Sequence, residues 1–267
     1  MNRKCALITG ASKGIGYSIC FELAAKGWNL IIVARTESKL SDLKNQLESV
    51  FDINVYCIVL DLRLATERKS LLIRLKELQI SLCALINNAG YGSSGLFHHQ
   101  DNEWELGQIR LNVEALVDLT HKCLPELIDN QGYVLNIAST AGFQPGPYMS
   151  VYYASKAFVL HFSEALDMEL KETGVSVTAH CPGATISEFS KVSGNEKSML
   201  FSKYNLIMTS ERVAKHAVQS MFQRKRVAIP GLHNKLTVLM VRLLPRRLVV
   251  WGASWINRPR KYLGPLT

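Results

Sequence analysis

The chain has 267 residues, a length that suits one domain or at most two small ones. Hydrophobic residues make up 48% and charged residues 20%, which excludes a disordered or collagen-like chain. The net charge of +9 is unevenly placed, because residues 1–211 carry −3 and residues 212–267 carry +12 with no acidic residue. The sequence therefore has a nearly neutral body and a basic tail.

Six scattered cysteines lie in apolar stretches and form no C-x-x-C pair. This pattern predicts buried thiols in a reducing compartment, so we expect a cytoplasmic protein. The apolar run Cys5–Ile8 is too short for a signal peptide, and no apolar window reaches the length of a transmembrane helix. We expect no metal site, because the pair His98-His99 lacks a supporting carboxylate or cysteine pattern.

Apolar runs that predict strands alternate with segments of helical periodicity. The predicted strands cover residues 5–8, 28–34, 54–60, 82–86, 133–138 and 175–181. The predicted helices cover residues 15–24, 40–47, 71–78, 101–129 and 152–172. The strand runs are continuous rather than alternating, which is typical of a parallel sheet covered on both faces. We predict a doubly wound α/β fold. Residues 184–208 lack clear periodicity and are either a mobile segment beside a pocket or a plain surface loop.

A glycine-rich turn joins the first strand to the first helix. It reads Thr9-Gly10-Ala11-Ser12-Lys13-Gly14-Ile15-Gly16. Glycines let a pyrophosphate approach the backbone, and the helix N-terminus supplies N–H donors and positive potential. The spacing is Gly-x-x-x-Gly-x-Gly, and any tight strand–helix turn favours glycine. The position of this turn in the fold nevertheless favours dinucleotide binding.

Arg35 directly follows the second predicted strand, where an NAD-preferring site usually has a carboxylate. A guanidinium offers paired donors to a 2′-phosphate, and Lys13 in the glycine turn adds a second positive charge. The alternative is that both are solvated surface charges. We predict NADP(H) as the cofactor in preference to NAD(H).

Tyr152 and Lys156 stand four residues apart at the start of a predicted helix, so their side chains share one face. A free phenol has a pKa of about 10, and a nearby ammonium is expected to lower it. Such a tyrosine can exchange a proton with a carbonyl oxygen. Ser139 ends the fifth strand, at the sheet edge where α/β sites form, and its hydroxyl can orient the same oxygen.

Several motifs, taken together in their order and spacing, resemble those of one known protein family. They are Thr9–Gly16, Asn87-Asn88-Ala89-Gly90, Asn112, Ser139, Tyr152, Lys156 and Pro182-Gly183. In order and spacing they resemble the short-chain dehydrogenase/reductase family of the single-domain type. The resemblance covers roughly residues 4–230 and implies a Rossmann-fold catalytic domain over 1–230, with a separate helical tail over 231–267.

The resemblance also implies the residue roles. Tyr152 would be the general acid/base, Lys156 would lower its pKa and bind the nicotinamide ribose, Ser139 would polarise the carbonyl, and Asn112 would hold a relay water. Further cofactor contacts would come from Asp61, Leu62, Asn88, Ala89, Gly90, Pro182, Gly183, Thr185 and Ser187. Ser187 stands where the family often has threonine. Residues 179–189 and the tail look like a bacterial branch similar to long-chain 3-oxoacyl reductases and hydroxysteroid dehydrogenases.

Between Ser139 and Tyr152 lies a group of large apolar residues. They are Phe143, Pro145, Pro147, Tyr148 and Met149. We expect them to form one wall of a pocket for a hydrophobic substrate, although plain packing explains them equally well.

The tail has the pattern of a basic amphipathic helix. Its apolar positions are Leu236, Leu239, Met240, Leu243, Leu244, Leu248, Trp251 and Trp255, and its basic positions are Lys235, Arg242 and Arg246. Such a helix can lie on a membrane surface, here the inner face, or pack on the body or on a sister subunit. We expect no nucleic-acid partner, because no binding motif accompanies the charge.

The sequence thus predicts an NADPH-dependent reductase of a hydrophobic ketone, 3-oxoacyl or steroid-like carbonyl. Two alternatives stay open: an NAD-dependent alcohol dehydrogenase, and a nucleotide-bound sensor or membrane scaffold without catalysis. By resemblance we expect a homodimer or homotetramer that pairs through the helices around 112–129 and 152–172.

Overall fold

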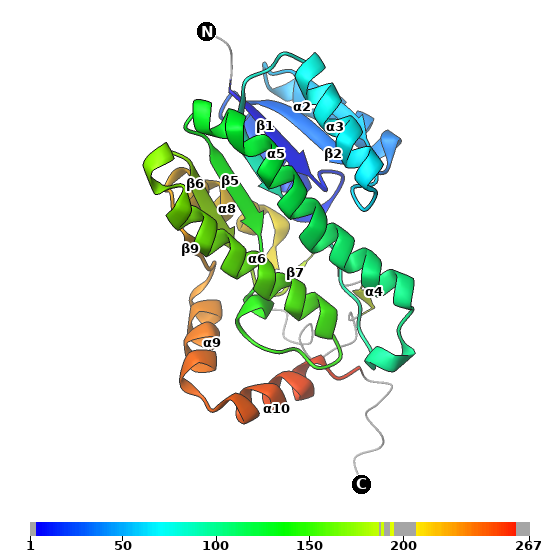
Figure 1. Ribbon diagram of the computed structural model, residues 1–267, viewed down its shortest axis with the longest axis vertical. Coiled ribbons are helices and arrows are strands. Elements are labelled where there is room, and N and C mark those ends of the chain that lie inside the picture. Colours follow the sequence, from blue (N-terminus) through cyan, green and yellow to red (C-terminus); the bar gives the residue numbers. More distant parts are fainter. Residues whose placement is uncertain (1–3, 187, 190–192, 195–206, 260–267) are drawn as a thin grey trace.

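A computed structural model describes residues 4–186, 188–189, 193–194 and 207–259. The strands of its main sheet are parallel and lie in the order β3-β2-β1-β4-β5-β6-β9 (Figure 1). They are β1 (Cys5–Thr9), β2 (Asn29–Ala34), β3 (Val55–Val59), β4 (Leu82–Asn87), β5 (Tyr133–Ile137), β6 (Ser176–His180) and β9 (Val227–Ala228). A second, two-stranded sheet pairs β7 (Thr185–Ile186) with β8 (Met208–Thr209).

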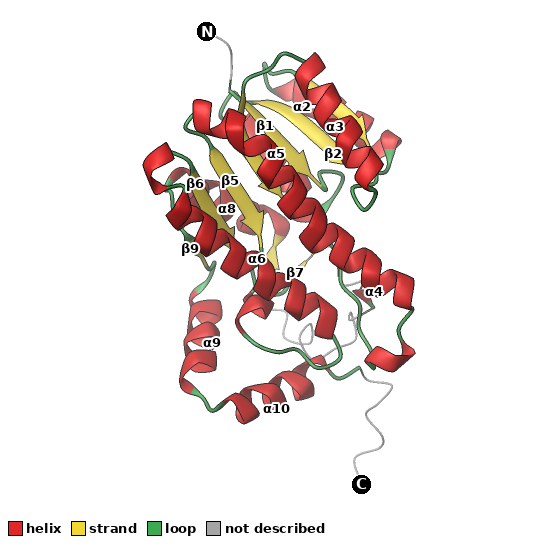
Figure 2. Ribbon diagram, viewed as in Figure 1, coloured by secondary structure: helices red, strands yellow, loops and turns green. Residues whose placement is uncertain are grey.

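Helices cover both faces of the main sheet (Figure 2). The helices of one face are α1 (Gly14–Ala24), α2 (Glu37–Val50) and α8 (Ser210–Phe222), and those of the other are α3 (Ala65–Glu77), α5 (Ala115–Asp129) and α6 (Ser150–Glu169). Strands β1, β4 and β6 are buried along their whole length, which explains their continuous apolar runs. The doubly wound fold predicted from the sequence is confirmed.

The order of the strands reverses between β1 and β4. Connections on the two sides of this point leave the sheet in opposite directions, so a crevice opens at the carboxyl ends of the strands. The glycine turn follows β1, and the Asn87–Gly90 segment begins at the end of β4. The fold therefore brings these two distant segments together.

The six predicted strands are present, but the sequence analysis missed β9 and α8. Strand β9 has only two residues, too few to give a periodic signal. The predicted helix 101–129 is three elements: α4 (Asn102–Ile109), a π-helical turn η2 (Arg110–Glu114) and α5. The predicted helix 152–172 begins at Ser150 and ends at Glu169, followed by a short 3₁₀ turn, Lys171–Thr173.

The tail forms two helices, α9 (Leu232–Leu243) and α10 (Arg246–Asn257), at the end of the molecule to which the strands point (Figure 1). Their inward residues Val238, Val249 and Ala253 are buried. The helical tail is confirmed, whereas its separation from the body at residue 230 stays a prediction. Within the described ranges, no helix is long and apolar enough to cross a membrane.

Candidate active site

A cavity of about 630 Å³ lies at the carboxyl ends of the strands. Most residues predicted for the site line it: Gly10, Ser12, Lys13, Gly14, Ile15, Arg35, Asp61, Leu62, Asn88, Ala89, Gly90, Ser139, Tyr152, Lys156, Pro182, Gly183 and Thr185. Gly16 and Asn112 are not among its lining residues, and Ser187 lies outside the described residues. Sequence positions more than 170 residues apart thus share one cavity.

The glycine turn is held against the Asn87–Gly90 segment by the side chain of Asn88. Its amide nitrogen donates to the carbonyl oxygens of Thr9 at 2.9 Å and of Gly10 at 3.0 Å. Gly10 has a φ of +66°, which favours glycine. A Cβ at Gly16 would stand 2.3 Å from the Asn88 amide nitrogen and 2.4 Å from the Gly10 carbonyl oxygen. Gly16 is therefore required by this packing rather than by contact with a ligand.

The Thr9 hydroxyl adds a second connection between β1 and β4. It accepts from the backbone N–H groups of Asn88 and Ala89, both at 3.0 Å, and donates to the Ile86 carbonyl at 3.2 Å. The hydroxyl is buried, so these bonds are shielded from water. The backbone beside the glycine turn is thereby fixed in one arrangement.

The N-terminus of α1 faces the cavity through Gly14 and Ile15. Its N-cap residue, Lys13, has an extended backbone and makes no side-chain hydrogen bond to the helix. The first N–H groups of the helix are therefore open to an anion, with the positive end of the helix dipole behind them. This donor set fits the pyrophosphate of a dinucleotide.

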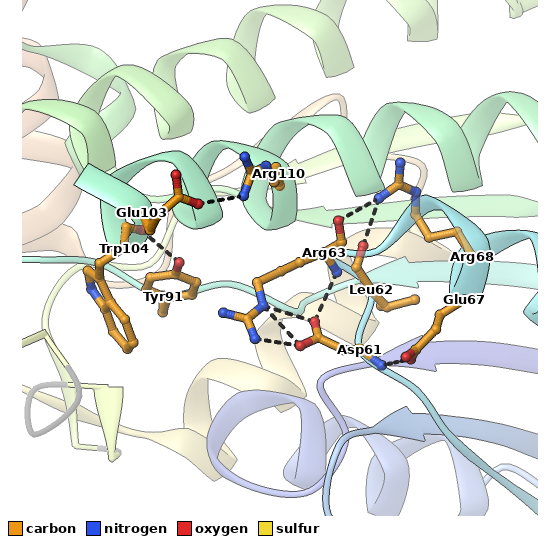
Figure 3. A network of polar contacts seen from close by, with 9 residues as sticks. All are labelled: Asp61, Leu62, Arg63, Glu67, Arg68, Tyr91, Glu103, Trp104 and Arg110. Carbon is orange, nitrogen blue, oxygen red and sulfur yellow. Dashed lines mark hydrogen bonds and ion pairs between the residues drawn. The ribbon is translucent and has the colours of Figure 1, made fainter. Parts of the chain in front are cut away.

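Charged side chains line the cavity near the ends of β2 and β3, and Figure 3 shows two of them, Asp61 and Arg63, in contact. Arg35 is exposed at the end of β2. Arg63 donates to both carboxylate oxygens of Asp61, at 2.5 to 3.0 Å, and this contact holds the pKa of Asp61 below its usual value. Lys13 forms an ion pair with Glu188 at 2.7 Å across the cavity. These two acidic groups and three cations thus line the cavity.

Arg63 and Glu188 were missed from the sequence. Arg63 follows Asp61 by two residues, a spacing at which an aspartate side chain commonly accepts a hydrogen bond from the backbone. Here the backbone N–H of Arg63 donates to the Asp61 carboxylate at 3.0 Å. That local signal was available. Glu188 lies 175 residues from its partner Lys13, so nothing local pointed to the pair.

Tyr152 is half-buried near the N-terminus of α6, with its ring 5.1 Å from that of Phe189 and 6.1 Å from that of Tyr153. Burial raises the pKa of its phenol, and a hydrogen bond with Ser139 acts in the opposite direction. The sequence-based expectation of a lowered pKa is wrong for this structure, because desolvation outweighs the favourable contacts. The phenol is therefore protonated at neutral pH.

Ser139 caps the short 3₁₀ turn Thr140–Phe143, where its hydroxyl oxygen accepts from the Ala141 N–H at 3.1 Å. The same hydroxyl donates to the Pro182 carbonyl at 3.3 Å. This distance is long for an O–H donor, so the bond is easily exchanged for another acceptor. Ser139 therefore holds a hydroxyl beside Tyr152 that can turn toward a carbonyl oxygen.

Lys156 lies one turn after Tyr152 on α6 and is buried. Its Nζ donates to the Ile137 carbonyl at 2.7 Å and stands 5.9 Å from the centre of the Tyr152 ring. Burial lowers the pKa of the ammonium from its usual range to about 8. The group has three donors, so donors remain for other acceptors in the cavity.

Asn112 lies in the π-helical turn η2, where the Ala115 N–H donates five residues back to the Arg110 carbonyl. Its side-chain amide donates to the Tyr91 carbonyl at 2.9 Å and to the Ser155 hydroxyl at 3.0 Å, and its oxygen accepts from the Tyr91 N–H at 3.1 Å. Asn112 thus ties the Tyr91 backbone to α6. Its side chain is fully engaged in this connection.

The other end of the cavity is apolar. Its wall consists of Met149, Phe189, Ile207, Val238, Val241, Ala253, Trp255 and Ile256. Of the apolar wall predicted between Ser139 and Tyr152, Met149 alone lines this cavity. Phe143, Pro145 and Pro147 instead line a separate cavity of about 560 Å³ between α6 and Arg246. The prediction failed for them because the turn Thr140–Phe143 carries them to the other side of α6.

The tail supplies much of the apolar wall, which the sequence analysis did not foresee. Asn257, at the end of α10, is buried and exchanges hydrogen bonds with the Tyr153 hydroxyl at 3.0 to 3.2 Å. It also donates to the Pro147 carbonyl at 3.3 Å. A Cβ at Gly146 would fall 2.2 Å from the Tyr153 ring, so glycine makes room for that ring. These contacts fix α10 against the start of α6.

Comparisons with known proteins agree with this geometry. The family model described as short chain dehydrogenase matches residues 4–198. The chain is 33% identical to the sulfoacetaldehyde reductase of Chromohalobacter salexigens over 243 residues, which are 89% of this chain and 94% of that protein. Curated relatives also include very-long-chain 3-oxoacyl-CoA reductases and inactive hydroxysteroid dehydrogenase-like proteins.

Two solved structures are similar along most of the chain. A short-chain dehydrogenase from Sphingobium yanoikuyae in complex with NADPH has a TM-score of 0.79 at 33% identity, covering 90% of this chain and 93% of that one. The bulky-bulky ketone specific alcohol dehydrogenase from Comamonas testosteroni has a TM-score of 0.76 at 31% identity, covering 91% and 94%. Together with the glycine turn and the Ser139, Tyr152 and Lys156 arrangement, these matches show that the chain belongs to the short-chain dehydrogenase/reductase family of oxidoreductases.

Proposed function

We propose that the chain is an NADPH-dependent reductase that converts a ketone or aldehyde with a sizeable apolar part into an alcohol. The observation that carries this proposal is that Tyr152 and Ser139 share a cavity with the open N-terminus of α1 and with an apolar wall. The open helix N-terminus suits a dinucleotide, and the apolar wall suits an apolar carbonyl compound.

The proposed chemistry uses four groups of the chain. Bound NADPH supplies the hydride that the carbonyl carbon accepts. Tyr152 donates its phenolic proton to the carbonyl oxygen, while the Ser139 hydroxyl hydrogen-bonds the same oxygen. Lys156, whose pKa of about 8 lies near neutrality, binds the ribose and supplies positive charge beside the phenol. Because the Asn112 side chain is engaged with Tyr91 and Ser155, a water relay here would use the backbone of the π-helical turn.

Burial raises the pKa of the Tyr152 phenol, so the group carries its proton at neutral pH. A reductase uses this protonated form as its donor, and an alcohol dehydrogenase uses the phenolate as its base. Because the same groups serve both directions, the alternative of an oxidative enzyme is tested by comparing NADPH-driven ketone reduction with NAD⁺-driven alcohol oxidation.

The preference for NADP(H) rests on the charges at the adenosine end. Arg35 is exposed beside the cavity, and the Asp61 carboxylate is already paired with Arg63. No acid ends β2, where a carboxylate would bind the 2′-hydroxyl of NAD. These charges support the binding of a 2′-phosphate by Arg35, and the similarity to an NADPH complex supports the same choice.

The apolar wall favours a hydrophobic substrate over a small anionic one. The described cavity residues from α9 and α10 include no lysine or arginine: five are apolar, and three are polar, namely His233, Asn234 and Thr237. A sulfonate, such as that of the sulfoacetaldehyde named for one relative, requires a paired cation when it is removed from water. The bulky ketones named for the Comamonas enzyme suit this wall better, as do 3-oxoacyl or steroid-like compounds.

The chain is also proposed to form a homodimer or homotetramer through α5 and α6. Phe158 and Met168 on α6 are exposed, and the Phe158 ring stacks on that of Phe162 at 5.7 Å. Exposed aromatic side chains of this kind are typical of subunit interfaces.

The decisive experiment is the variant Tyr152→Phe, compared with the remote variant Tyr56→Phe. We expect Tyr152→Phe to bind NADPH as the wild type does but to lose turnover of apolar ketones by about a thousandfold or more. Binding is measured by NADPH fluorescence and turnover by NADPH consumption. Retained turnover in this variant would contradict the mechanism, and a wild type inactive on a broad carbonyl screen would favour a non-catalytic sensor or scaffold.

A further inference from the structure

The outward side of α9 and α10 presents a row of large apolar side chains to solvent. We define the outer tail face by Leu232, Leu236, Leu239, Leu243, Leu248 and Trp251. Leu232, Leu243 and Trp251 expose 72%, 70% and 72% of their surface. The spacing of three to four residues places the members of each helix on one side. Of the alternatives left open by the sequence, packing on the body does not apply to these six residues, because the body contacts the opposite side of each helix through Val238, Val249 and Ala253.

Two exposed apolar rows of this kind, on consecutive helices, indicate a partner, because soluble proteins rarely expose large apolar areas without a function. Charge identifies the partner. Lys235, Arg246 and Arg247 are exposed on the same two helices, and no acidic residue follows Glu211 in the sequence. Two copies facing each other through this surface would bring cations against cations. An anionic lipid surface complements both the apolar row and the positive charge.

The active-site cavity reaches the same side of the molecule. Trp255 and Ile256 line the cavity and are also exposed, with 55% and 38% of their surface accessible. They follow Trp251 by one turn of α10, so the apolar end of the cavity borders the outer tail face. Figure 1 shows both tail helices at the end of the molecule beyond the carboxyl edge of the sheet.

We propose that the outer tail face docks on an anionic lipid bilayer and places the apolar end of the cavity at its surface. The two helices lie in the headgroup region with Trp251 and the leucines inserted, while the basic residues contact lipid phosphates. A hydrophobic substrate dissolved in the bilayer then enters the cavity without crossing water. This last step rests on the proposed reductase function, whereas the docking itself does not.

Flotation of the full-length protein with vesicles tests the docking. We expect it to float with vesicles of equal parts phosphatidylcholine and phosphatidylglycerol and to bind phosphatidylcholine alone far more weakly. Leu243→Ser combined with Trp251→Ser should lower binding by about tenfold or more, since both side chains leave the lipid boundary. Lys235→Gln and Arg247→Gln should each lower it by about fivefold.

The matched control is Val50→Ser combined with Ile73→Ser, two exposed apolar residues on α2 and α3 that should leave flotation unchanged. Quenching of tryptophan fluorescence by brominated lipids, reduced in Trp251→Phe, should place α10 in the headgroup region. A wild type that stays unbound with both vesicles would overturn the proposal. So would a concentration-dependent dimer that Leu243→Ser and Trp251→Ser dissociate, because the face would then pair with a second copy.

Flotation requires no substrate, so its outcome is independent of the proposed reductase function. A chain that floats but reduces no carbonyl would contradict that function and leave the docking intact. A chain that reduces apolar ketones but does not float would contradict the docking alone. If both hold, vesicles should lower the apparent KM for a membrane-partitioned ketone and leave that for a water-soluble ketone unchanged.

Discussion

In the proposed cofactor half of the cavity, formed by Gly10–Gly16, Arg35 and Asn88, glycine conformations and hydrogen bonds of Thr9 and Asn88 fix the backbone of the turn. In the substrate half, formed by Met149, Tyr153, α9 and α10, the wall consists of side chains that come from distant segments. The Tyr153–Asn257 bond spans 104 residues. The first half tolerates almost no change of shape, whereas the second is held by a few polar contacts and apolar packing. The relatives named above are described by different substrates, and a wall built from distant side chains can vary in this way without changing the fold.

The strongest test of this difference between the two halves replaces one glycine by alanine in each half and so adds one methyl group to each. Gly16→Ala should destabilise the fold by about 3 kcal/mol and abolish NADPH binding, because its Cβ would fall 2.4 Å from the Gly10 carbonyl oxygen. Gly252→Ala on α10 meets nothing within 4 Å and should leave stability unchanged or slightly higher. Urea denaturation of both variants measures the difference. Equal losses would mean that the two halves are equally rigid.

Arg35→Ala tests the charge of the cofactor half without altering its shape. We expect the affinity for NADPH to fall by about tenfold to a hundredfold, with little change for NADH, because the side chain is exposed and would contact the 2′-phosphate alone. Titration of both cofactors against Arg35→Ala and the neighbouring variant Lys39→Ala checks this. An equal loss for NADH and NADPH would show that Arg35 acts on the shared part of the dinucleotide.

The pH dependence of reduction reports on Tyr152 and Lys156, which lie between the two halves of the cavity. Burial lowers the pKa of Lys156 to about 8 and raises that of Tyr152, so Lys156 loses its charge first as the pH rises. With saturating NADPH, kcat should fall above pH 8, by about tenfold for each further unit. In Lys156→Arg the charge persists, and the decline should move to higher pH. A decline that stays in place would assign it to another group.

The sequence was sufficient for the parts of the cavity that depend on local signals. The glycines, Arg35 and the Tyr152–Lys156 pair lie within single turns or strands, where spacing alone sets the geometry. It was not sufficient for Glu188, for Asn257 or for the displacement of Phe143 and Pro145, since these depend on how remote segments meet. The raised pKa of Tyr152 was missed for the same reason, because desolvation is a property of the assembled cavity.

The smallest expected effect concerns the bond that holds α10 in place. Asn257→Ala leaves the buried Tyr153 hydroxyl without its partner, which should cost about 1 to 3 kcal/mol of unfolding free energy. The wall would loosen, so KM for bulky ketones should rise a fewfold while kcat for small ketones stays nearly constant. Tyr153→Phe combined with Asn257→Leu removes both polar groups and should recover part of the stability, since neither partner is then left unsatisfied. A double variant as unstable as the sum of the two single variants would show that the hydrogen bond itself is not what fixes α10, and that the substrate half is held by its apolar packing alone.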